Sequence, residues 1–238
     1  MLECRFQHYG RARFRNNTNL PGLAQFLILT LLTLFVAFDA TADSWPAAQT
    51  REVFSASREY FVRVVPGESV GDTVGFFGGG KGKFATAEFY RRARDRSYQV
   101  IAQTRLPHPI APVEFFVADI GRLATVDNWH NMGYGKIVSI YDSRGELVRF
   151  FELRDLFSAD EIKSFPHSVS SIQWRKGPLY IREDQKTLLI TVKSGAEFLF
   201  GLESGQYQYC EQYEKSYRCR NSNEPREWTA RNKAPLTR

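Results

Sequence analysis

The chain has 238 residues, 43% of them hydrophobic, and a formal net charge of +6 at pH 7. The excess of positive charge is mild and is spread along the chain, whereas a nucleic-acid-binding protein gathers its basic residues into a stripe. Composition therefore argues against a nucleic-acid partner, and no motif of catalysis or metal binding stands out.

The first 42 residues have the order of a secretory signal peptide. Four arginines precede an apolar run from Phe26 to Phe38, and Ala40-Thr41-Ala42 is a small-x-small cleavage site. The apolar run is about 13 residues long, whereas a membrane-spanning helix needs roughly 20. We therefore expect cleavage before Asp43 and export to the periplasm or the cell exterior. If the segment is retained instead, it tethers the chain to the membrane.

From Val53 to Gln208 the chain is a succession of short apolar and aromatic runs that end in glycine, aspartate, asparagine or serine. Each run has the length and composition of a strand. The clearest runs are Glu59–Val65, Lys83–Arg91, Tyr98–Arg105, Val113–Ala118, Leu123–Asp127, Lys136–Tyr141, Glu146–Leu153, Thr187–Val192 and Glu197–Leu202. Because strands joined by tight turns are antiparallel neighbours, we expect an all-β antiparallel meander over residues 53–209, after a linker at 43–52.

A weak internal repeat runs through this meander. The turn at Asp119-Ile120-Gly121 leads into one strand and the turn at Asp142-Ser143-Arg144-Gly145 into another, and the stretch Ile172–Gln206 repeats that order. This rhythm resembles the blades of β-propellers, which recur about every 40 to 45 residues. The whole also resembles uncharacterised secreted bacterial proteins that bear such a meander. The resemblance implies about three blade-type units in an open or incomplete array, closure by self-association, or a curved sandwich, and it implies no activity.

One short helix is expected between Leu153 and Phe165. Ser158 and Glu161 have the spacing of a capping box, in which each side chain bonds the backbone of the other residue. Pro166 ends the helix, because proline cannot continue the hydrogen-bond ladder.

Two cysteines remain after the signal peptide, Cys210 and Cys219. In an oxidising compartment, two thiols with no other partner most simply form a disulfide, so we expect a closed segment at 210–219. From residue 220 to 238 the chain is polar, with no apolar periodicity, and we expect it to be disordered.

The segment from Asp127 to Gly135 has the densest set of polar and aromatic residues. Its candidate ligand-binding residues are Asp127, Asn128, Trp129, His130 and Tyr134. Trp129 and Tyr134 could stack on a ligand, and Asp127 with His130 could act as an acid–base pair. The same residues also suit a structural corner, since Asp and Asn cap turns and glycines permit positive φ.

Other residues that could carry chemistry are few. His108 and His167 stand beside prolines in expected turns, so they are interpreted as surface or capping residues rather than metal ligands. Trp174 is interpreted as a core aromatic residue and Arg175 as an exposed cation. We expect no metal and no cofactor.

Together these observations favour an exported, non-catalytic module that binds a protein or a component of the cell envelope through its loops. The first alternative is a small extracytoplasmic hydrolase or carbohydrate-active enzyme that uses Asp127 and His130. The second is a membrane-tethered accessory subunit, which requires the N-terminal segment to be retained.

Overall fold

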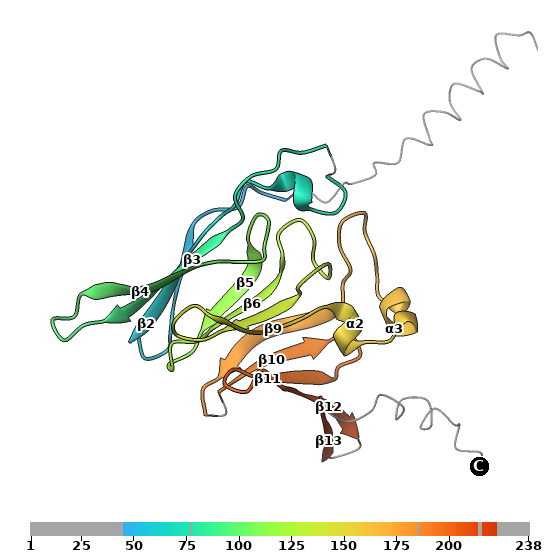
Figure 1. Cartoon of the computed structure of the whole chain (residues 1–238). Coiled ribbons are helices and arrows are strands. Elements are labelled where there is room, and N and C mark those ends of the chain that lie inside the picture. Colours follow the sequence, from blue (N-terminus) through green and yellow to red (C-terminus); the bar gives the residue numbers. More distant parts are fainter. Residues whose placement is uncertain (1–44, 77, 185, 214–215, 223–238) are drawn as a thin grey trace, which may run out of the picture. The chain divides into compact units, whose positions relative to one another are not determined.

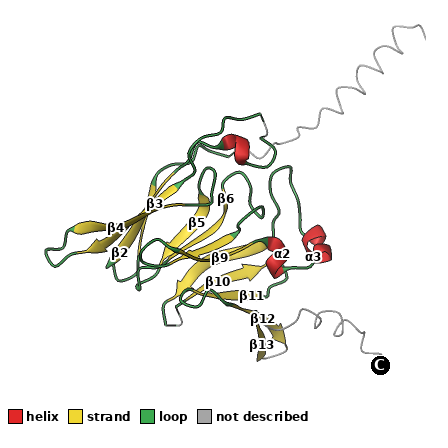
Figure 2. Cartoon of the chain, in the orientation of Figure 1, coloured by secondary structure: helices red, strands yellow, loops and turns green. Residues whose placement is uncertain are grey.

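The structure, a computed structural model, describes residues 45–76, 78–184, 186–213 and 216–222. These residues belong to one compact unit of the chain, Asp43–Arg238. The expected signal peptide and most of the expected C-terminal tail lie outside the described ranges. Figures 1 and 2 show that the described residues form successive antiparallel sheets with very little helix.

The strands form three meanders in chain order. The first sheet has the order β1-β2-β3-β4, the second β5-β6-β7-β8, and the third β13-β12-β11-β10-β9. The bounds in the first two sheets are β1 Arg51–Phe54, β2 Tyr60–Val65, β3 Thr86–Arg92, β4 Tyr98–Arg105, β5 Pro112–Val117, β6 Leu123–Asn128, β7 Val138–Tyr141 and β8 Leu147–Phe151. In the third sheet they are β9 Arg175–Arg182, β10 Thr187–Val192, β11 Glu197–Gly201, β12 Tyr207–Tyr213 and β13 Ser216–Asn221. The predicted all-β meander of about three blade-type units is confirmed.

The central strands of the second sheet, β6 and β7, are buried at every position. Because successive side chains of a strand point to opposite faces, this sheet packs on both faces. Leu123 and Tyr141 pack with residues of the first sheet, such as Phe89. Val126 and Ile140 pack with residues of the third sheet in a separate cluster. The core therefore consists of two apolar layers that share the second sheet.

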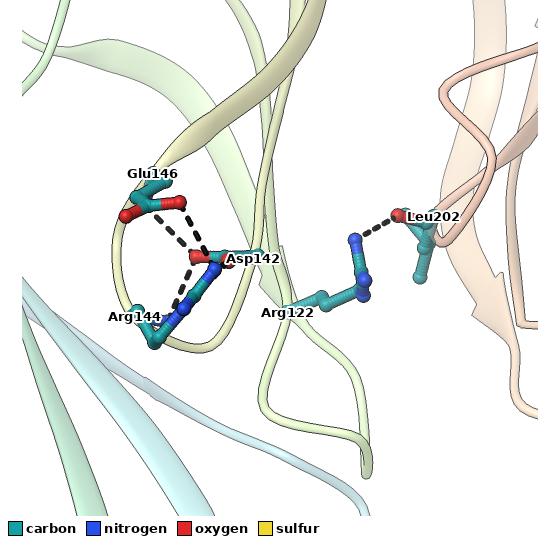
Figure 3. Close-up of polar contacts among 5 residues, drawn as sticks. All are labelled: Arg122, Asp142, Arg144, Glu146 and Leu202. Carbon is teal, nitrogen blue, oxygen red and sulfur yellow. Dashed lines mark hydrogen bonds and ion pairs between the residues drawn. The ribbon is translucent and has the colours of Figure 1, made fainter.

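Polar contacts at the turns add to this packing. The guanidinium of Arg122, in the turn between β5 and β6, donates to the carbonyl of Leu202 at 2.8 Å and so joins the second sheet to the third (Figure 3). In the β7–β8 turn, the Asp142 carboxylate accepts from the backbone N–H groups of Arg144 and Glu146, each at 2.9 Å. The side chain of Asp142 thus stabilises the turn through hydrogen bonds within the turn itself.

The expected single helix is two helices, α2 (Leu153–Leu156) and α3 (Ala159–Ser164), and a short 3₁₀ turn, η1, covers Val70–Asp72. The division falls at Phe157 and Ser158, which both have extended backbone. The predicted capping box is present: the Ser158 hydroxyl accepts from the Glu161 N–H at 3.3 Å, and the Glu161 carboxylate accepts from the Ser158 N–H at 2.8 Å. This cap begins a new helix instead of extending the first.

The predicted disulfide between Cys210 and Cys219 is present. Cys210 on β12 and Cys219 on β13 are directly opposite each other in the antiparallel pairing of these two strands. The disulfide therefore crosslinks the edge strand β13 of the third sheet to its neighbour β12. β13 includes two residues that the sequence places in the tail. Within the described ranges, no helix is long and apolar enough to span a membrane.

Candidate functional site

Asp127 stands at the end of β6 with a left-handed backbone, φ 58°. An extended backbone would place its carboxylate on the face of Thr125, toward the first sheet. Instead, Oδ1 accepts from the indole N–H of Trp174 at 2.8 Å and from the Gly133 N–H at 3.0 Å. Oδ2 accepts from Nε of Arg175 at 2.7 Å. The carboxylate is fully buried and ties β6 to the start of the third sheet.

A third charged group, the carboxylate of Glu114, joins the buried ion pair of Asp127 and Arg175. Nη2 of Arg175 lies 2.9 Å from a carboxylate oxygen of Glu114 on β5. Burial raises the pKa of the Asp127 carboxyl, and the contacts from Arg175, Trp174 and Gly133 oppose that rise. Both oxygens of Asp127 are thus engaged in holding two sheets and the loop together.

Asn128 faces the opposite way, toward the first sheet. Its Oδ1 is 2.6 Å from Nδ1 of His108, whose Nε2 is 2.9 Å from the Thr125 hydroxyl. Its amide nitrogen donates to the carbonyl of Tyr134 at 2.6 Å. Because the Asn128 oxygen only accepts, His108 carries its proton on Nδ1 and accepts from Thr125 on Nε2. Burial lowers the pKa of His108 to about 4, so the ring is neutral.

Trp129 and His130 lie outside this network, on the solvent side of the loop. The Trp129 indole N–H donates to the carbonyl of Pro46 at 3.0 Å, and its ring centroid is 5.3 Å from that of Trp45. The His130 ring lies between Trp45 and Phe76, at centroid distances of 5.8 and 5.3 Å. Burial lowers the pKa of His130. These aromatic contacts fasten the N-terminal stretch and the loop after η1 against the segment.

Asn131 completes the corner. Its Oδ1 accepts from the Val74 N–H at 2.6 Å, and its amide nitrogen donates to the carbonyls of Val74 and His130 at 3.0 and 2.9 Å. Gly133 has φ +79°, and a Cβ there would lie 2.7 Å from the Ile172 carbonyl oxygen, so only glycine fits. The segment from 127 to 135 is therefore a junction between the second sheet, the start of the third sheet and the loops that flank the first sheet.

A cavity of about 590 Å³ opens beside this junction, where the first sheet meets the second. Its walls come from the end of β4 and the residues that follow it, from three residues between β2 and β3, from the candidate loop and from the β7–β8 region. They consist of Asp72, Val74, Phe84, Thr104, Arg105, Leu106, Pro107, Pro109, Asn128, Asn131, Tyr134, Gly135, Lys136, Tyr141, Leu147 and Glu152. Two of the five predicted site residues, Asn128 and Tyr134, line it.

The structure does not bring the proposed acid–base pair together. Asp127 bonds Gly133, Trp174 and Arg175, whereas His130 packs against aromatic rings, and neither residue lines the 590 Å³ cavity. A second cavity of about 430 Å³, on the side of the third sheet, is lined by Met132, Arg175 and Lys176 among others. Across the described ranges, no three His, Cys, Asp or Glu side chains gather to form a metal site.

Sequence reasoning misplaced two residues of this region. His108 is fully buried rather than at the surface, and Arg175 is nearly buried, with 10% of its side chain exposed. Trp174 is buried in the core as predicted. The reason is that each misplaced residue has a buried polar partner distant in sequence, Asn128 for His108 and Asp127 for Arg175. Arg105 and Lys136, which line the cavity, carry no sequence signal beyond their charge.

No family model and no curated protein matches this chain. Among solved structures, it is similar to a periplasmic gluconolactonase from Pseudomonas aeruginosa, with a TM-score of 0.37 and 14% sequence identity. The match covers 72% of this chain and 55% of that one, so the chain spans about half the length of that protein.

Proposed function

We propose that this protein is an exported, non-catalytic binding module that holds a small ligand in the cavity between its first and second sheets. The observation that carries the proposal is the 590 Å³ cavity, which has the size of a small-molecule site and is lined by Asn128 and Tyr134 of the candidate loop. Asp127 and His130, the residues of the enzymatic alternative, do not line it.

The lining of the cavity suits a ligand with an apolar body. Phe84, Leu106, Tyr134 and Leu147 supply apolar and aromatic surface, and Asn128 and Asn131 hold the loop wall in place through bonds to Tyr134 and Val74. A wall fixed in this way is preorganised, so a ligand meets little of the ordering penalty that weakens binding to mobile loops.

Export is the second part of the proposal. It rests on the order of features in residues 1–42 and agrees with the Cys210–Cys219 disulfide, since structural disulfides persist in oxidising compartments. A membrane-tethered accessory subunit is the outcome if residues 1–42 are retained.

The test fills the cavity and measures binding of an uncharged aromatic probe, N-phenyl-1-naphthylamine, by its fluorescence. We expect the probe to bind the wild type and Leu147→Phe to weaken binding about tenfold, because the larger ring occupies space that the probe needs. Leu147 is 45% exposed, so the variant keeps the fold, which a thermal unfolding midpoint checks.

The matched control is Val169→Phe, at a side chain that is 86% exposed and does not line the cavity. It should bind the probe as the wild type does. Absence of probe binding to the wild type, or equal binding by both variants and the wild type, would exclude the cavity as the binding site.

A further inference from the structure

The walls of the 590 Å³ cavity carry four charged side chains: Asp72, Arg105, Lys136 and Glu152. The two carboxylates are already engaged by neighbours. Asp72 accepts from the Ser69 hydroxyl at 2.7 Å and lies 3.3 Å from Nζ of Lys81. Glu152 lies 2.7 Å from a guanidinium nitrogen of its neighbour Arg154. Lys81 and Arg154 are thus the cations in contact with the wall's carboxylates, and the charge of Arg105 acts on Asp72 from a greater distance.

The two cations are placed differently. Within the described ranges, neither Arg105 nor Lys136 has a carboxylate within 4.0 Å. Instead, Cζ of Arg105 lies 4.3 Å from the centroid of the Phe84 ring, and Nζ of Lys136 lies 4.3 Å from that of Phe150. Stacking on a ring holds a guanidinium in place and leaves the N–H donors along its edge available to a ligand.

The two amide side chains of the candidate loop that line the cavity have protein partners. Asn128 uses both its oxygen and its nitrogen, on His108 and on the Tyr134 carbonyl, and Asn131 uses both on Val74 and other backbone carbonyls. Arg105 and Lys136 are thus the charged donors that this wall offers a ligand, beside the rings of Phe84 and Phe150, and the hydroxyls of Thr104 and Tyr134 add neutral ones.

We propose that the cavity binds a small organic anion. Its acidic group is held by Arg105 and Lys136, and its apolar or aromatic body packs against Phe84 and Tyr134. This inference rests on the proposed function and adds the chemical class of the ligand. A carboxylate, sulfonate or phosphate ester supplies the same charge, so the class is defined by one anionic group joined to an apolar body.

The experiment compares two fluorescent probes that share one aromatic body, 8-anilinonaphthalene-1-sulfonate, which is an anion, and the uncharged N-phenyl-1-naphthylamine. We expect the anion to bind the wild type at least about tenfold more tightly, because hydrogen bonds to charged groups contribute more than neutral ones. Arg105→Gln and Lys136→Gln should each remove most of that preference, because they weaken binding of the anion far more than binding of the uncharged probe.

Two controls isolate the effect of charge at this cavity. Lys176→Gln removes a cation from the wall of the 430 Å³ cavity and should leave both affinities unchanged. On the wild type, raising the salt concentration from about 50 to about 500 mM should weaken binding of the anion and not of the uncharged probe. The salt titration needs no variant, so it stands even where a substitution impairs folding.

The outcomes separate this inference from the proposed function. If both probes bind equally and Leu147→Phe weakens both, the cavity binds ligands and the anion inference is overturned. If Lys176→Gln abolishes the preference for the anion while Arg105→Gln does not, the anion site lies at the other cavity and the inference is again overturned. If Leu147→Phe changes the affinity for neither probe, the proposed function is overturned, and the anion inference that rests on it is overturned as well.

Discussion

At the scale of residues, two neighbours at the end of β6 act in opposite directions. The left-handed backbone of Asp127 turns its carboxylate toward Arg175 and Trp174 at the start of the third sheet, and Asn128 bonds His108 beside the first. Left-handed backbone at a residue other than glycine is unfavourable, and a structure keeps it where surrounding contacts compensate. Here a buried ion pair and two hydrogen bonds provide those contacts.

His108 gives this region a predictable dependence on pH. Its pKa is about 4 in the folded chain, against an ordinary value of 6.5. Between these values the unfolded chain binds the proton and the folded chain does not. The stabilisation is therefore complete above about pH 6.5 and is lost as the pH falls toward 4, by about 3 kcal/mol in all.

Urea unfolding of the wild type and of His108→Gln from pH 7 to pH 4 measures this effect. The variant is less stable at pH 7, and its free energy of unfolding should fall less steeply with acid than that of the wild type. His167→Gln, which removes an exposed histidine, is the control and should follow the wild type. Parallel curves for the wild type and His108→Gln would show that His108 does not titrate on unfolding.

These residues also show where sequence reasoning reaches its limit. The Ser158–Glu161 capping box and the turn at Asp142 are predictable because the partners are within four residues of each other. The burial of His108 and Arg175 is not, because it depends on contacts with β6 from residues 20 and 48 positions away. Charge and polarity place such residues at the surface unless the partner is known.

The residues of the candidate site also fall into two groups, those that the sequence indicates and those that it does not. The sequence singles out the loop that contains Asn128 and Tyr134, since its polar and aromatic density is local information. It does not assign Arg105 and Lys136 to the same cavity, because they come from β4 and from the segment before β7 and meet only after the first two sheets pack. Periodicity likewise predicts the strands and leaves the packing of one sheet on another undetermined.

At the scale of elements, the outermost ribbon of the third sheet is the part most dependent on its crosslink. β13 pairs only with β12, and its residues with described side chains are mostly exposed. An exposed two-stranded extension gains little from burial, so the Cys210–Cys219 disulfide contributes a large share of its stability, about 2 to 3 kcal/mol for a loop this short.

This ribbon gives a test of export. We expect full-length protein recovered from the periplasm of a bacterial host to begin at Asp43 and to show no thiol that reacts with maleimide until a reductant is added. The same chain without residues 1–42, kept in the cytoplasm, is the control and should show two reactive thiols, because that compartment is reducing. An exported chain that still begins at Met1 would favour the membrane-tethered alternative.

At the scale of the molecule, the second sheet decides whether the described residues unfold together. Both of its faces are apolar, one packed with Phe89 of the first sheet and the other with Phe198 of the third. A sheet that loses a neighbour exposes a whole apolar face to water, so no sheet is stable by itself. Polar contacts made by Arg122, Asp127 and Asn128 also join the second sheet to its neighbours, so the stability of each sheet depends further on the others.

We therefore predict one cooperative unit, which hydrogen exchange followed by mass spectrometry can resolve sheet by sheet. Phe89→Ala removes a buried ring and should destabilise the chain by about 3 to 5 kcal/mol. Because the three sheets unfold together, the exchange rates of the slowest amides of β3, β6 and β10 should rise by similar factors. Phe198→Ala should give the same pattern. Faster exchange confined to β1–β4 in Phe89→Ala would mean that the first sheet opens independently. The cavity between the first and second sheets would then open with it, and ligand affinity would follow the stability of that interface.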